Sequence, residues 1–256
     1  MYKGIKAGWR PSLVLILLFI LWELASTFFE IPKWLLPAPS EIWLEALAGW
    51  PKYHHHIWAT IQLTVIGFGI GNSVGVLVAI ALHLMPRVRE AFYPLMILSQ
   101  NIPIIVLAPL LVIWFGFGMM PKIIVITLVC FFPIAVSALD GFRQTSQELI
   151  HYMKMAGASK KQIFFKLELP HALPSLFSGL KISATYSVMG AVISEWLGAN
   201  KGIGVYMTLA SSSFRTDRVF VAILMIMILC MLFFSIIISL EKLFIRWRPK
   251  GEGSSE

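Results

Sequence analysis

Charged residues are scarce in this chain, and their scarcity excludes an ordinary soluble domain. Aspartate, glutamate, lysine and arginine together make up 13% of the 256 residues, whereas hydrophobic residues make up 58%. Soluble domains of average composition are about one quarter charged. With so few charges a soluble fold would leave large apolar patches in water, so we interpret the chain as an integral membrane protein.

Cysteine is nearly absent as well. The two cysteines, Cys130 and Cys230, both lie inside apolar runs, so neither a disulfide framework nor a cysteine-based metal site is expected. The three consecutive histidines at residues 54–56 also suggest metal binding, but consecutive side chains of a regular element cannot all face one ion. We interpret them as a hydrated interfacial run, and we expect no metal and no other cofactor.

Motifs for catalysis and nucleotide binding are missing too. No Gly-Lys-Ser/Thr phosphate loop occurs. His83, His151 and His171 are scattered and the carboxylates are unpaired, so there is no credible acid–base pair. We therefore expect no catalytic residues, no enzymatic activity in this chain, and an energy source in a partner. The net charge of +8 does not indicate nucleic acid, because the basic residues gather in alternate loops instead of one patch.

Long uncharged runs are what the sequence does contain. At ~1.5 Å of rise per residue, about 20 apolar residues cross the ~30 Å hydrocarbon core of a bilayer. The runs predict an all-α integral membrane protein in which residues 1–256 form a single transmembrane domain of six helices. The expected spans are residues 11–29, 57–82, 91–117, 121–140, 172–196 and 219–240.

The basic residues also predict the orientation of these spans. If the N-terminus is cytoplasmic, the inner segments hold fourteen lysines and arginines, among them Arg246, Arg248 and Lys250, and the outer segments hold six. Basic residues concentrate in cytoplasmic loops. We therefore expect both termini, and the polar segment at residues 143–170, in the cytoplasm.

Two features inside the spans suggest close packing and a path. Gly67, Gly71 and Gly75 are each four residues apart, which lets another helix approach closely. The third span carries Gln100 and Asn101. Polar amides at membrane depth are tolerated only where they face protein or water. This span is therefore either a wall of a translocation path or a kinked helix whose polar groups a neighbouring helix satisfies.

The longest polar interruption lies at residues 143–170. The apolar residues that recur there at helical spacing are Leu149, Ile150, Met153 and Ala156. They predict an amphipathic helix that Gly157 ends. A second short helix is expected after Ser159, which is a suitable N-cap, and is expected to stop at Pro170. The segment is thus predicted to be two short helices with a glycine hinge, on the membrane surface and accessible to a soluble partner.

This segment resembles the cytoplasmic loop of the permease subunits of bacterial ATP-binding-cassette (ABC) importers. The shared sequence is Ala-Gly-Ala-Ser at residues 156–159 followed by Glu-Leu-Pro-His-Ala-Leu-Pro at residues 168–174, whereas the family's Glu-Ala-Ala triad is replaced at residues 151–153. The resemblance implies that the first helix is a coupling helix that sits in a groove of the ATP-hydrolysing subunit. The residues expected to take part in coupling are Tyr152, Met153, Lys154, Ala156, Gly157, Ala158 and Pro170.

Further stretches extend the resemblance over nearly the whole chain, among them LPAPSEIW, VLAPLLVIWFGFG and SGLKISATYSVMGAVISEWLGANKGIGVYM. They are similar to importer permeases of the sulfonate, nitrate and taurine type, and the last looks closest to permeases for thiamine-precursor pyrimidines or riboflavin. The family implies a permease homodimer in the lipid of the bacterial cytoplasmic membrane, with a dimer of ATP-binding subunits in the cytoplasm and a substrate-binding protein outside.

We therefore expect a permease that moves a small polar solute, such as a thiamine-precursor pyrimidine or a similar heterocycle. A sulfonate, taurine or nitrate importer is the alternative. An ion-coupled secondary transporter fits less well, because no inverted repeat is visible and Glu23, Lys181 and Glu195 are its only candidate ionisable groups within the spans. The residues expected to line the path are Gln100, Asn101, Ser183, Ser187, Met189, Gly190 and Glu195.

Overall fold

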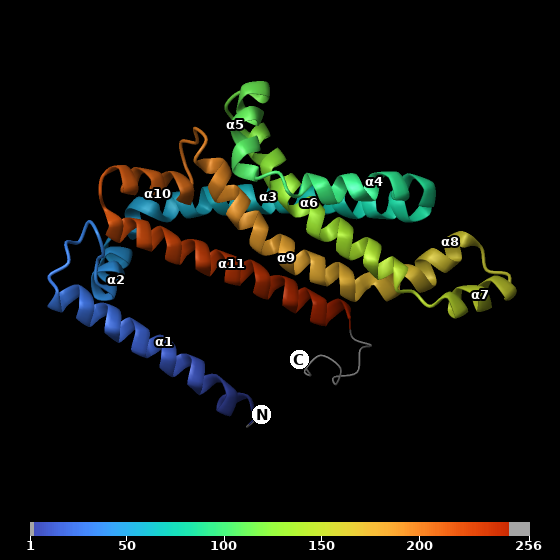
Figure 1. The fold of residues 1–256 in the computed structure, drawn as a ribbon, viewed down its shortest axis with the longest axis horizontal. Helices are drawn as coiled ribbons and strands as arrows, with labels where there is room; N and C mark the ends of the chain where they lie inside the picture. Colours follow the sequence, from blue (N-terminus) through green and yellow to red (C-terminus); the bar gives the residue numbers. More distant parts are fainter. Residues whose placement is uncertain (1–2, 246–256) are drawn as a thin grey trace.

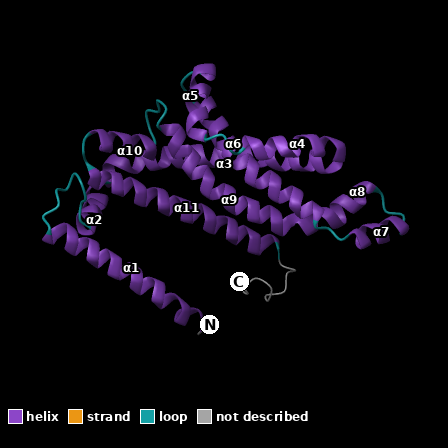
Figure 2. Ribbon diagram, in the orientation of Figure 1, coloured by secondary structure: helices purple, strands orange, loops and turns teal. Residues whose placement is uncertain are grey.

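The computed structural model describes residues 3–245, and within that range every regular element is a helix (Figure 2). Arg246, Arg248 and Lys250, which contribute to the expected orientation, lie outside the described residues. The elements are α1 (Lys3–Phe28), α2 (Pro39–Ala48), α3 (Trp50–Leu84), α4 (Pro86–Ser99), α5 (Ile104–Phe115), α6 (Met119–Arg143), α7 (Gln147–Met155), α8 (Lys160–Ile163), the π-helical turn η1 (Phe164–Glu168), α9 (Leu169–Glu195), α10 (Ile203–Ser212) and α11 (Thr216–Phe244).

Among the described residues, five helical segments are long and apolar enough to cross a membrane, and α4 with α5 counts as a sixth if this bent pair is taken as one span. The five segments are Trp9–Phe28, Trp50–Leu84, Met119–Arg143, Lys160–Glu195 and Thr216–Phe244. The predicted all-α membrane architecture is therefore confirmed.

The centre of the fold is α6, which packs against α3 and α9 (Figure 1). The glycines of α3 make the first of these contacts possible. A Cβ atom at Gly67 would lie 2.5 Å from the side chain of Ile126, and one at Gly75 would lie 2.2 Å from that of Ile134. Gly71 faces α6 in the same way. Helices that approach this closely gain van der Waals contact, which is what stabilises helix pairs in lipid, so the predicted packing role of the three glycines is confirmed.

The first span packs loosely against the rest of the chain. Only 6% of its apolar window is buried, and its attachment is at one end. There the carboxylate of Glu23 accepts hydrogen bonds from the backbone N–H and the hydroxyl of Ser40 in α2, at 3.0 and 2.7 Å, and Trp22 lies against Phe220 of α11. Most of α1 is therefore available to lipid or to another chain.

The interval at residues 91–117 differs from the single span that we expect from sequence. It is occupied by α4 and α5, which are bent by 100° at the break between them. Pro103 has no N–H group and disfavours helical conformation at the residue before it, and the side-chain amide of Asn101 donates to the carbonyl of Ile97 at 3.1 Å. The helix accordingly ends before the proline and restarts in a new direction.

The expectation that Pro170 stops a helix is wrong. The helix runs without interruption from α8 through η1 into α9. In the π turn the N–H of Leu169 bonds to the carbonyl of Phe164, five residues back. This wider turn directly precedes Pro170, which has no N–H group to donate. The helix therefore accommodates the proline ring and continues without an α-helical hydrogen bond at that position. The second helix of the loop is therefore the beginning of a membrane span.

The helix α3 begins at Trp50, so the histidine run lies on its first turns instead of in a connection. His54 and His55 are exposed, whereas His56 is buried. The prediction of a hydrated run is wrong for His56, which faces the protein.

Candidate functional site

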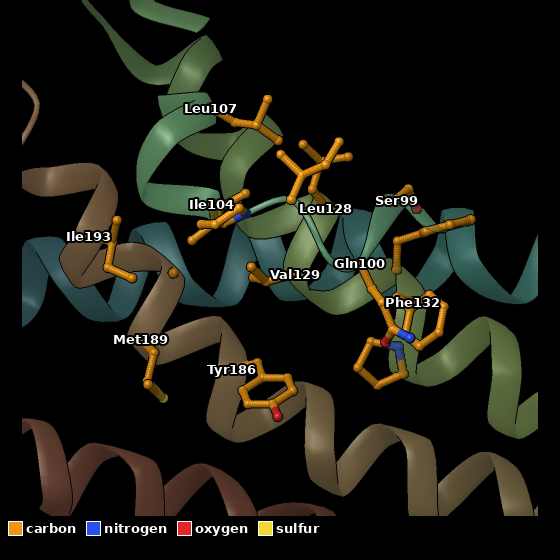
Figure 3. A pocket seen from close by; sticks show the side chains of 15 residues that line it. Ser99, Gln100, Ile104, Leu107, Leu128, Val129, Phe132, Tyr186, Met189 and Ile193 are labelled. Carbon is orange, nitrogen blue, oxygen red and sulfur yellow. The ribbon is translucent and has the colours of Figure 1, made fainter. Parts of the chain in front are cut away.

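An open hollow of about 590 Å³ lies where the break between α4 and α5 faces α6 and α9 (Figure 3). The residues that line it are Ser99, Gln100, Ile102, Pro103, Ile104, Leu107, Leu128, Val129, Phe131, Phe132, Pro133, Tyr186, Met189, Gly190 and Ile193. None of these side chains carries a charge. The broken helix creates the hollow, because a straight helix at residues 91–117 would not turn away from α6 at this point.

The chemical character of the hollow is apolar and aromatic with a few polar groups. Phe132 contributes a ring, and Tyr186 contributes a ring and a hydroxyl. The amide of Gln100 can both donate and accept hydrogen bonds. The hydroxyl of Ser99 already donates to the carbonyl of Met96 at 2.7 Å. Such a surface suits a planar solute with a few hydrogen-bonding groups.

Three of the seven residues expected to line a path lie at this hollow: Gln100, Met189 and Gly190. Gly190 contributes only backbone, because a Cβ atom there would lie 2.9 Å from the side chain of Val129 in α6. Asn101 is adjacent in sequence but is not among the lining residues.

Ser183 and Ser187 lie elsewhere, in the packed interior, where both are fully buried. The hydroxyl of Ser183 donates to the carbonyl of Cys130 in α6 at 2.9 Å, and that of Ser187 donates to the carbonyl of Ala184 at 2.8 Å. Small hydroxyl residues in membrane helices commonly bond to nearby carbonyls in this way. The polarity of a residue in a span therefore does not by itself predict that it lines the hollow. Tyr186 and Phe132 do line it, but nothing in the sequence distinguishes them from aromatic residues that face lipid.

Glu195 also lies away from the hollow, at the α10 end of α9. Its side chain is 2% exposed. Its carboxylate accepts hydrogen bonds from the hydroxyl of Thr60 in α3 at 2.7 Å and from the N–H of Gly204 at 2.8 Å. The glutamate therefore joins three helices, α3, α9 and α10.

Neighbouring groups complete this junction. The N–H of Ile203 donates to the hydroxyl oxygen of Thr60 at 2.8 Å, and the N–H of Gly202 donates to Nδ1 of His56 at 3.0 Å. The first N–H groups of a helix have no partner within the helix. Side chains of α3 and α9 supply those partners for α10, which explains the inward position of His56.

The other ionisable residues considered for ion coupling are also engaged in local contacts. Lys181 of α9 pairs with Glu241 of α11 at 3.1 Å, and Glu23 is bonded to Ser40 as described. None of these groups is among the residues that line the hollow.

The segment between α6 and α9 begins with a well-defined helix. The hydroxyl of Ser146 accepts from the N–H of Leu149 at the start of α7. At its end Gly157 has a φ of +80°. The N–H of Gly157 bonds to the carbonyl of Lys154 at 3.0 Å, and that of Ala158 bonds to the carbonyl of Met153 at 2.9 Å. This is a Schellman motif, which requires a left-handed residue and therefore favours glycine.

The predicted N-cap at Ser159 is confirmed. Its hydroxyl accepts from the N–H of Gln162 at 3.3 Å, and the side chain of Gln162 accepts from the N–H of Ser159 at 2.8 Å. This reciprocal capping box fixes the start of α8. The direction of α7 relative to α8 is thus set by two adjacent motifs, the Schellman turn and the box.

The exposed apolar face of α7 differs from the predicted stripe. Ile150 is buried and Met153 is half-buried, so both face the protein. The apolar residues that are exposed are Leu149 at 52%, Tyr152 at 68% and Met155 at 81%. Four of the residues expected to take part in coupling are exposed: Tyr152, Lys154, Ala156 and Gly157. The other three, Met153, Ala158 and Pro170, are half-buried, and Pro170 belongs to α9.

The helix α7 lies at the opposite end of the molecule from α10 (Figure 1).

Comparison with known proteins agrees with these features. The family described as "Binding-protein-dependent transport system inner membrane component" matches residues 71–245. The formylaminopyrimidine transport permease protein ThiX of Halalkalibacterium halodurans is 35% identical over 94% of this chain and 96% of its own. The riboflavin transport system permease protein RibX of Chloroflexus aurantiacus is 29% identical over 91% and 88%. The taurine transport system permease protein TauC of Escherichia coli is 31% identical over 85% and 82%.

A solved structure has the same fold. A chain of the MetNI methionine ABC transporter, in a study of its inward-facing conformations, aligns with a TM-score of 0.64 and 21% sequence identity. The alignment covers 74% of this chain and 94% of that one.

Proposed function

The chain belongs to the family of binding-protein-dependent transport system inner membrane components, and we propose how its parts carry out transport. It is a multi-pass permease of an ABC importer in the cell membrane. The proposal depends on two features of one bundle. An uncharged hollow lies among α4, α5, α6 and α9, and the exposed helix α7, which has a side-chain N-cap, lies at one end.

We propose that ATP is hydrolysed by a separate dimer of cytoplasmic subunits that binds α7. The chain has no phosphate-binding loop of its own. The apolar side chains of Leu149, Tyr152 and Met155 give α7 a face for a groove of a partner. The basic residues near this segment favour its cytoplasmic position, so we propose that both termini are inside and that a solute-binding protein meets the α10 end.

We propose that two copies of the chain enclose the path. In one copy the hollow is open, and its apolar lining suits closure by an equivalent surface. The path then follows Gln100, Tyr186, Met189 and the backbone of Gly190. Ser183, Ser187 and Glu195 are left out of it, because the packing of a single chain already encloses them.

We propose that the solute is an uncharged heterocycle of the pyrimidine kind, in preference to a sulfonate. Moving an anion into a low-dielectric site is costly unless a cation pairs with it, and the lining of the hollow supplies no such cation. The rings of Tyr186 and Phe132 offer stacking surfaces to a planar molecule. Formylaminopyrimidine, in the name of the relative that is 35% identical, meets this description.

Reconstituted vesicles test the proposal. The permease, its ATP-binding subunit and its binding protein should take up formylaminopyrimidine only when ATP is supplied, and taurine should not compete. Uptake driven by a pH gradient without the ATP-binding subunit would contradict the proposal. Uptake of taurine in place of the pyrimidine would contradict the solute class alone.

A substitution in the hollow tests the path. Met189→Trp places a large ring in the hollow, where Met189 is 48% exposed, and should lower uptake ~10-fold or more while the complex still assembles. Met231→Trp is the matched control, because Met231 is 69% exposed on α11 and does not line the hollow. Equal uptake by the two variants would show that solute does not pass Met189.

A further inference from the structure

A polar contact ties the segment where the loop enters the membrane to α3. Oε2 of Glu168, the last residue of η1, lies 3.0 Å from Nε2 of His83 in the last turn of α3. The two side chains are each 15% exposed. The contact ties the place where α8 becomes α9 to a helix that is 85 residues away in sequence.

Aromatic packing surrounds this contact. The ring of His83 lies 4.7 Å from that of Phe142 in α6 and 6.1 Å from that of Phe164 in η1, measured between centroids. Phe142 and Phe164 are both buried and lie 5.6 Å apart. Three helical segments, α3, α6 and η1, therefore meet at His83, so a movement of any one of them displaces the imidazole.

The imidazole is held in place mainly by Glu168. Within the part of the chain that the structure describes, the Nδ1 atom of His83 is buried and has no hydrogen-bond partner, so the bond to the carboxylate is the polar contact that orients the ring. The π turn that carries Glu168 is wider than an α-helical turn, and such turns are frequent at functional sites. The turn and the contact from Glu168 to His83 therefore lie at the same place in the fold.

We propose that η1 and the Glu168–His83 contact form the joint that passes movement of α7 and α8 to α3, and through α3 to the hollow. Glu168 and His83 are positioning residues in this scheme, since neither lines the hollow nor lies on α7. The proposal rests on the proposed function, because it requires that a partner moves α7. It adds the route by which that movement reaches the path.

The route continues along α3 by tight packing. The glycines of α3 leave no space between it and α6, and α6 supplies Leu128, Val129 and Phe132 to the hollow. A shift of the His83 end of α3 therefore cannot be absorbed by empty volume between the two helices, and it must move α6 or slide along it.

The test measures transmission without requiring a solute. In the assembled complex carrying Cys230→Ser and Met189→Cys, the rate at which N-ethylmaleimide labels position 189 reports access to the hollow. Addition of ATP with orthovanadate should change this rate. With Glu168→Ala the change should fall ~5-fold or more, a typical size for loss of allosteric coupling, while basal ATP hydrolysis and assembly persist.

Two further variants separate transmission from a general structural role. Glu241→Ala removes the ion pair between Glu241 and Lys181, which is similar to the Glu168–His83 pair in distance and burial but joins α9 to α11 away from the loop. This control variant should retain the full nucleotide-dependent change in labelling rate. Glu168→Gln keeps an oxygen acceptor for Nε2 of His83 and should show most of the nucleotide-dependent change in labelling rate. An undiminished change in Glu168→Ala, or an equal loss in Glu241→Ala, would overturn the proposal. Absence of any change in the unaltered complex would instead contradict the proposed function.

Discussion

The two ends of α9 are both fastened to α3 through a glutamate, but in different ways. At the α10 end, Glu195 is 2% exposed and accepts hydrogen bonds from Thr60 and Gly204. At the α7 end, the one side-chain hydrogen bond that Glu168 makes within residues 3–245 is with His83, and both side chains are partly accessible. The first attachment lies at the start of α10, whose first N–H groups are bonded to side chains of α3 and α9, and the second lies beside a π turn.

From this difference we infer that the Glu195 end of α9, here called the fixed end, is held more firmly than the Glu168 end, here called the movable end. Displacing Glu195 would leave the buried N–H of Gly204 without its acceptor and would leave the Thr60 hydroxyl with the carbonyl of His56, 3.2 Å away; a buried donor without an acceptor costs about 1–3 kcal/mol. Displacing Glu168 exposes a carboxylate that water already reaches in part. The α10 end is therefore suited to hold the fold, and the α7 end to respond to a partner.

The largest effect on stability is expected at the fixed end, from Gly202→Ala. Gly202 has a φ of +137°, and a Cβ atom there would lie 2.1 Å from the carboxyl carbon of Glu195. Strain and overlap together should lower the free energy of unfolding by roughly 3 kcal/mol or more, seen as a lower melting temperature in detergent. Gly118→Ala is the control, because Gly118 also has a positive φ, +149°, but open space around it. Equal melting temperatures would show that the junction at Glu195 is loose.

A smaller effect is expected when each glutamate is removed in turn. Glu195→Ala should lower the free energy of unfolding by about 1–3 kcal/mol, because the buried N–H of Gly204 loses its acceptor. Glu168→Ala should cost less than ~1 kcal/mol, as expected of a partly exposed pair. Thermal unfolding of the two variants side by side measures the difference, and the reverse order would contradict the assignment of fixed and movable ends.

The elements that sequence predicts well are those set by local chemistry. Hydropathy locates the long helices, Ser159 carries its capping partner three residues later, and Gly157 has the conformation that a helix end of this kind requires. The glycine spacing in α3 predicts close packing because a missing side chain leaves the backbone exposed whatever the partner helix is.

The features that sequence does not predict depend on contacts between distant segments. Glu195 and Thr60 are 135 residues apart, so the sequence around either residue does not predict the hydrogen bond between them. Pro170 suggests a helix end, but the π turn before it continues the helix and packs through Phe164 against His83 of α3. Ser183 is placed on a buried face of α9, and in a helix that is apolar all round the faces toward lipid and toward protein look alike.

The smallest effect on the fold is expected at the movable end, from Gly157→Pro. Proline fixes φ near −65° and removes the N–H that bonds to Lys154, so the Schellman turn cannot form and α7 is re-aimed. The membrane helices keep their internal hydrogen bonds. Gly157 has open space around it, so the melting temperature should change by only a few degrees.

The most direct test of the account is ATP hydrolysis by the complete complex carrying Gly157→Pro, measured with and without the loaded binding protein. The account predicts that basal hydrolysis and assembly persist while stimulation by the binding protein falls ~5-fold or more. The control is Gly157→Ala, which should lose less stimulation than Gly157→Pro. A proline elsewhere, such as Gly69→Pro, is unsuitable as a control because it breaks α3. Full stimulation in Gly157→Pro would show that α7 does not couple ATP hydrolysis to the membrane helices, and would contradict the account.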